Sequence, residues 1–99
     1  MSHTMLELIV VPELEFRLVE HLLSTKEGRG FHSFPVQGHG ESVECFNAEE
    51  LVAGKKRNVM FRLFMPQGEA EALIEELGKA FPGSGVRYFL LPVLGSGEL

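Results

Sequence analysis

The chain has 99 residues, 44% of them apolar, and no internal repeat, so we expect one hydrophobic core and a single domain over residues 1–99. Fourteen acidic residues against nine basic ones give a net charge of −5, which excludes a nucleic-acid partner unless a local basic patch outweighs the overall field. Cys45 is the only cysteine, which excludes an internal disulfide and suits the reducing cytoplasm, where we expect the protein to reside.

The first predicted strand spans Met5–Val11, because apolar residues occupy both of its alternating faces. The apolar run is interrupted by Glu7, its lone charge, and is too short for a helix inserted directly into a membrane. Because no cationic segment precedes the run, it does not match a signal peptide either. Pro12 then favours a helical first turn, and we expect a helix from Pro12 to about Ser24. Its apolar stripe consists of Leu14, Leu18, Val19, Leu22 and Leu23.

The second predicted strand spans Phe31–Gln37 and is followed by a long loop over Gly38–Gly54. Within the loop, Asn47 stands three residues before Glu50, a partial capping-box spacing that favours one helical turn with a glycine stop. Loops of this length are uncommon in compact domains unless they bind a partner or are mobile. We therefore expect a flexible loop with a binding role.

The remaining sequence predicts a third strand, a second helix and a fourth strand. Apolar residues alternate over Lys55–Met65, and they recur at helical spacing over Glu69–Phe81. Pro82–Gly85 forms a turn, and Val86–Val93 is almost continuously apolar, as a strand is. The pattern makes no assignment for residues 94–99.

The order β-α-β-β-α-β with right-handed crossovers predicts an α+β, ferredoxin-like fold, in which a four-stranded antiparallel sheet carries both helices on one face. Both alternating faces of the strands are apolar, so the second face would be exposed in a single chain. We expect self-association to cover it, although the long loop is an alternative cover. The residues expected at this contact are Ile9, Phe64, Phe89 and Leu91.

A group of metal-ligating residue types lies on and beside the loop. Imidazole, thiolate and carboxylate ligands suit zinc, copper or nickel, and a neighbouring chain could supply some of them. The spacing matches no standard metal motif, so a solvated polar loop is the alternative interpretation. The candidate ligands are His39 and Cys45, with His32 or Glu44 contributing.

A basic run, Lys55-Lys56-Arg57, follows the loop and could bind phosphate or carboxylate, with Arg87 joining from elsewhere. The alternative is a solvated strand end whose charges discourage pairing of sheet edges. The sequence contains neither a recognisable nucleophile context nor paired carboxylates at catalytic spacing, so we expect no enzymatic activity.

Five short motifs are distributed over nearly the whole chain: Val10-Val11-Pro12-Glu13, Gly30-Phe31-His32-Ser33-Phe34-Pro35-Val36, Gly38-His39-Gly40, Leu51-Val52-Ala53-Gly54 and Phe81-Pro82-Gly83-Ser84-Gly85. Together they resemble an uncharacterised family of the PII-like superfamily, which is related to the nitrogen-signalling PII proteins and to CutA-type proteins. The resemblance implies a homotrimer whose sheets face the threefold axis, with small-ligand sites between subunits.

The resemblance also implies that the loop contacts a partner protein, through residues such as Gly38, Gly40, Glu41 and Phe46. Members of the group are similar to proteins encoded beside heavy-metal efflux pumps, which implies a membrane transporter or efflux pump as the partner. The turn at Pro82–Gly85 lacks the basic residues with which nitrogen-signalling relatives hold nucleotide phosphates, and this places nucleotide binding in doubt.

Three functional hypotheses follow. The first is a PII-like regulatory protein that binds a small ligand and presents its loop to a partner. The second is a CutA-like protein of metal tolerance that binds a transition metal through the loop. The third is a structural interaction module without a ligand.

Overall fold

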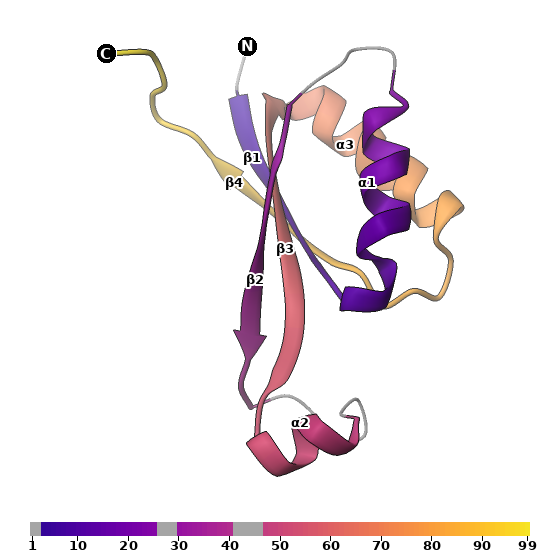
Figure 1. The fold of residues 1–99 in the computed structure, drawn as a ribbon. Helices are drawn as coiled ribbons and strands as arrows, with labels where there is room; N and C mark the ends of the chain where they lie inside the picture. The colour runs from indigo at the N-terminus through magenta and orange to yellow at the C-terminus, as the bar shows by residue number, and fades with distance from the viewer. Residues whose placement is uncertain (1–2, 26–29, 41–46) are drawn as a thin grey trace.

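The computed structural model describes residues 3–25, 30–40 and 47–99, excluding the side chains of residues 51–53. The predicted order of strands and helices is confirmed, and the helical turn expected within the long loop is present as a short helix (Figure 1). The elements are β1 (His3–Val10), the 3-10 turn η1 (Pro12–Leu14), α1 (Glu15–Leu23), β2 (His32–Gly38), α2 (Ala48–Ala53), β3 (Lys56–Pro66), α3 (Gln67–Ala80) and β4 (Arg87–Pro92).

The four strands form one antiparallel sheet in the order β2-β3-β1-β4, which confirms the ferredoxin-like fold. In Figure 1, α1 and α3 lie together on one side of the sheet, and none of the described helices covers the opposite side. The short helix α2 lies beyond both layers, at the end of the β2–β3 hairpin. The described part of the chain contains no helix long and apolar enough to cross a membrane.

The hydrophobic core lies between the sheet and the two long helices. Alternate residues of the central strands β1 and β3 point into it, and Phe61, Leu6 and Leu8 are among its largest fully buried side chains. Among the described residues, the buried cluster comprises Leu6, Leu8, Val10, Leu18, Leu22, Val59, Phe61, Leu63, Met65, Ala70 and Leu77. The buried residues of β1 and β3 therefore lie on the face opposite Ile9 and Phe64, which were expected at a contact with another chain.

Several details differ from the sequence prediction. Leu23 was placed in the apolar stripe of the first helix but is exposed, because successive helical residues are about 100° apart and Leu22 already faces the core. The strand β1 begins before the predicted Met5, since Thr4 is buried and its hydroxyl donates to the carbonyl oxygen of Met65 at 3.0 Å. Gly38, the first residue of the predicted loop, belongs to β2, and the helical turn expected in the loop extends over residues 48–53 as α2.

Candidate functional site

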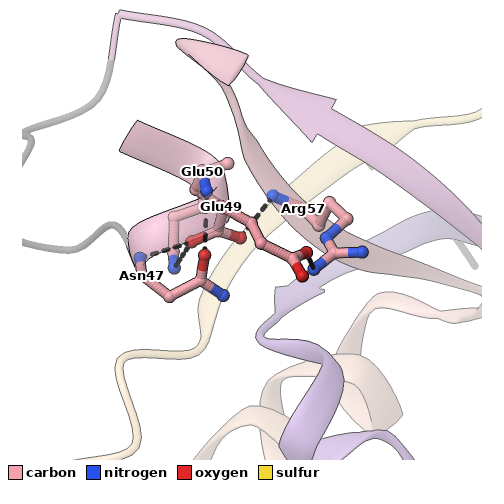
Figure 2. A network of polar contacts seen from close by, with 5 residues as sticks. Asn47, Glu49, Glu50 and Arg57 are labelled. Carbon is pink, nitrogen blue, oxygen red and sulfur yellow. Dashed lines mark hydrogen bonds and ion pairs between the residues drawn. The ribbon is translucent and has the colours of Figure 1, made fainter. Parts of the chain in front are cut away.

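The helix α2 is fixed at its start by a complete capping box, as the spacing of Asn47 and Glu50 predicted (Figure 2). The backbone N–H of Glu50 donates to Asn47 Oδ1 at 2.8 Å, and the N–H of Asn47 donates to Glu50 Oε1 at 3.0 Å. At its end, Gly54 adopts φ 72°, a left-handed conformation that glycine adopts without strain. We call the unit from Asn47 to Arg57 the tip.

Glu50 also attaches α2 to the first residues of β3, a role that the sequence did not reveal. The Oε2 atom of its buried carboxylate accepts a hydrogen bond of 2.8 Å from the backbone N–H of Arg57 (Figure 2). The Lys56 ammonium lies 3.4 Å from Oε1 of the same carboxylate. The hydrogen bonds from Asn47 and then from Arg57 lower the pKa of this carboxyl below its ordinary value of 4.5, assisted by Lys56 and opposed by burial. Glu50 is thus charged at neutral pH and holds the tip together.

Acidification should therefore detach α2 from β3. The pKa of Glu50 is lower in the folded state than in the unfolded state, where it is near 4.5. The Glu50 carboxylate therefore stabilises the fold above pH 4.5, and this stabilisation is lost as the pH falls through the folded-state pKa. We expect the amide protection of Gly54 and Arg57, after correction for intrinsic exchange rates, to fall below pH 4.5.

Two variants separate this effect from general acid unfolding. Glu50→Gln should show low protection of these amides already at pH 7, whereas Glu49→Gln, which alters an exposed carboxylate, should behave as the unmodified protein does. Equal protection of the Arg57 amide at pH 7 in Glu50→Gln and the unmodified chain would contradict the assigned role.

The predicted anion ligands do not all meet within one chain. Lys56 and Arg57 lie at the tip, where Arg57 Nη2 is 2.9 Å from Glu49 Oε2 in an exposed ion pair. Lys55 is half-buried beside them. Arg87 begins β4 and lies two strands across the sheet and four register positions along it from Lys56, roughly 17 Å between Cα atoms. The anion site stays a prediction, in which a neighbouring chain would supply Arg87.

The predicted metal ligands are likewise separated. His32 begins β2 and His39 follows its last residue, so the two residues are seven positions apart along extended chain, a distance of about 23 Å. Cys45 and Glu44 lie outside the described residues, as do the predicted partner-loop residues Glu41 and Phe46. Over the described ranges, no three potential ligands come close enough to hold a metal ion. The metal site also stays a prediction.

The side of the sheet opposite α1 and α3, here called the helix-free face, carries an extended apolar surface. It gathers the four residues predicted at an oligomer contact, and Phe64, Phe89 and Leu91 are exposed there. The register places Phe64, Met5 and Leu91 side by side across three strands. The residues of the face include His3, Met5, Glu7, Ile9, His32, Phe34, Val36, Met60, Arg62, Phe64, Arg87, Phe89 and Leu91.

One polar feature of this face was not predicted. Arg62 Nε donates to Glu7 Oε2 at 2.9 Å, and the Arg62 guanidinium lies over the Phe34 ring at 5.2 Å from its centroid. The alternation of β1 and β3 places Glu7 and Arg62 on the same face as the apolar residues, so the signal was present in the sequence. The pairing itself depended on the register of the two strands.

Comparisons with known proteins place this arrangement in a family. A family model described as "Protein of unknown function (DUF3240)" matches residues 1–99. No curated protein matches the chain. Among solved structures, a DUF3240 family protein from Shewanella baltica OS155 is similar, with a TM-score of 0.77 at 20% identity, over 100% of this chain and 98% of that one.

Two further structures share the fold. A functionally unknown protein from Pediococcus pentosaceus ATCC 25745 has a TM-score of 0.66 at 12% identity, over 100% of this chain and 99% of that one. A protein from Thermus thermophilus, provisionally described as a PII-like signalling protein, has a TM-score of 0.59 at 21% identity, over 94% of this chain and 91% of that one. The predicted resemblance to an uncharacterised PII-like family is therefore confirmed at the level of fold. Because the family model matches all 99 residues, the chain belongs to the DUF3240 family.

Proposed function

We propose that the protein is a cytoplasmic PII-like signalling protein that regulates and does not catalyse. In this proposal it assembles as a homotrimer through the helix-free face, binds a small ligand and presents residues 38–54 to a partner protein such as a membrane transporter or efflux pump. The observation that carries the proposal is the position of the tip, which stands at the end of the β2–β3 hairpin away from the helical layer (Figure 1). The fold shared with the Thermus thermophilus protein supports the PII-like kind.

The contacts of the tip suggest how a ligand would influence it. Arg57 is joined to α2 twice, by its backbone N–H to Glu50 and by its guanidinium to Glu49. The second contact is an exposed ion pair, and such pairs contribute only about 0–1 kcal/mol. An anionic ligand can therefore replace Glu49 as the partner of Arg57 and alter how α2 is held, while Glu50 keeps the hairpin end intact.

Assembly supports the same proposal. Arg87 lies two strands and three register positions from Arg57 within one chain, and in this proposal it approaches the tip from a neighbouring subunit. Trimer formation would also cover the exposed Phe64, Phe89 and Leu91, and apolar surface of this kind is normally buried against a partner. Ligand binding and assembly are therefore expected to be coupled.

Native mass spectrometry of the intact protein tests the proposal, because it reports subunit number and bound mass together. We expect a trimer that binds at least one probe among ATP, ADP, inorganic phosphate, Zn²⁺, Cu²⁺ and Ni²⁺. For an anionic probe, Arg57→Gln should weaken binding at least tenfold. Arg17→Gln, a matched change on α1, should leave it unchanged.

A protein that remains a single chain and binds none of these probes would contradict the proposal. Equal affinity of an anionic probe for Arg57→Gln and the unmodified protein would instead remove the tip from the binding site. If a metal ion alone binds, the sequence-based ligands His39 and Cys45 become the residues to replace.

A further inference from the structure

The centre of the helix-free face is charged, although the rows on either side of it are largely apolar. Glu7 and Arg62 are direct cross-strand partners, with Phe89 beside Glu7 and His32 beside Arg62. The next row in one direction contains Phe64, Met5 and Leu91. The next row in the other direction contains Phe34, Met60, Ile9 and Arg87. Any partner that covers the apolar rows must also cover the ion pair.

The ion pair is held in one orientation but is only partly shielded from solvent. Arg62 donates through Nε to Glu7, and its guanidinium stacks on Phe34, so its position is set from two sides. The side chain of Glu7 is 15% exposed and that of Arg62 is 49% exposed. A guanidinium has five N–H donors in a fixed plane, and those that lose water on burial need new acceptors.

A second copy of this chain satisfies these requirements. It brings the same apolar rows, and its own Glu7 carboxylate supplies acceptors for the Arg62 of the first copy. The face is therefore complementary to itself in both apolar character and charge. The helical layer is a poorer partner for it, because most exposed charges of α1 and α3 are glutamates, and Phe16 and Leu23 are the exposed large apolar residues of these two helices.

We infer that Glu7 and Arg62 determine how copies of this chain meet, with Arg62 of one subunit contacting Glu7 of the next. The inference rests on the proposed self-association and adds the residues that make it specific. Burial of apolar surface is non-directional, so the apolar rows alone would allow several arrangements. Arrangements that leave Arg62 buried without an acceptor are disfavoured, because an unpaired buried charge is strongly destabilising.

A charge exchange tests the contact between subunits. The variant with Glu7→Arg and Arg62→Glu keeps an ion pair within each chain and should assemble alone with the stoichiometry of the unmodified protein. Mixed with isotopically labelled unmodified chains, it should form mixed oligomers at least tenfold below the statistical proportion, because like charges would meet across the contact. Native mass spectrometry measures these proportions.

Exchange of another ion pair is the matched control. Glu75→Lys with Lys79→Glu reverses an exposed pair on α3, and this variant should mix statistically with unmodified chains. Statistical mixing of the Glu7 and Arg62 variant would overturn the inference, and so would its failure to assemble alone. An unmodified protein that is itself a single chain would instead overturn the proposed assembly, which distinguishes the two failures.

A second variant tests specificity directly. Glu7→Leu with Arg62→Met replaces the ion pair by apolar side chains of similar size, and such replacement often preserves or increases affinity. We expect this variant to assemble but to populate more than one stoichiometry in native mass spectra. A single stoichiometry equal to that of the unmodified protein would contradict the role of the ion pair.

Discussion

Phe89→Glu should convert the assembled protein into single folded chains at micromolar concentration. Phe89 lies on the helix-free face, directly opposite Glu7 in the register of β1 and β4, and its side chain is 50% exposed in one chain. The new carboxylate would lose water at the contact and would stand beside a second negative charge, Glu7, which separates it from Arg62 in the same row. Because the residue does not belong to the core between sheet and helices, each chain should still fold.

Size-exclusion chromatography with light scattering measures this result, and circular dichroism checks that the chain is folded. Phe16→Glu is the matched control, because Phe16 is 71% exposed on α1, on the helical side of the molecule. It should leave the assembled mass unchanged. If Phe89→Glu kept the mass of the unmodified protein, the helix-free face would not be the contact surface.

Phe61→Ala should lower the free energy of unfolding by about 3–5 kcal/mol, a large part of the roughly 5–15 kcal/mol typical of a domain. Phe61 is fully buried on the central strand β3, and its ring lies 5.9 Å from that of Phe31 between centroids. Removal of the ring leaves a cavity that the neighbouring strands on both sides can only partly close.

Urea denaturation followed by circular dichroism measures this loss, at one fixed chain concentration because assembly also stabilises the folded state. Phe16→Ala removes the same group from an exposed position and should change the unfolding free energy by no more than about 0.5 kcal/mol. A loss below about 1 kcal/mol for Phe61→Ala would contradict the assigned core.

The sequence predicted the elements and their faces because local periodicity carries that information. Leu6 and Leu8 alternate with Met5 and Ile9, which is sufficient to define two apolar faces of β1. The helical pattern was less precise at the end of α1, where Leu23 lies just outside the buried arc. Periodicity identifies a stripe but not its exact width.

The candidate sites were predicted less completely, because they depend on contacts between residues distant in sequence. The spacing of Asn47 and Glu50 predicted the capping box, but the second contact of Glu50 depends on where β3 begins. Similarly, His32 and His39 were grouped by chemistry, while the extended strand between them separates them. Arg62 was overlooked because its partner Glu7 is 55 residues away in the chain.

Sedimentation equilibrium of the unmodified protein at micromolar concentration tests the central claim most directly, because the proposed ligand site and the role of the helix-free face both require assembly. We expect a single species with three times the 11.0 kDa mass of one chain. A monodisperse species of 11.0 kDa would contradict the account, since the apolar face would then remain exposed to water in the functional protein.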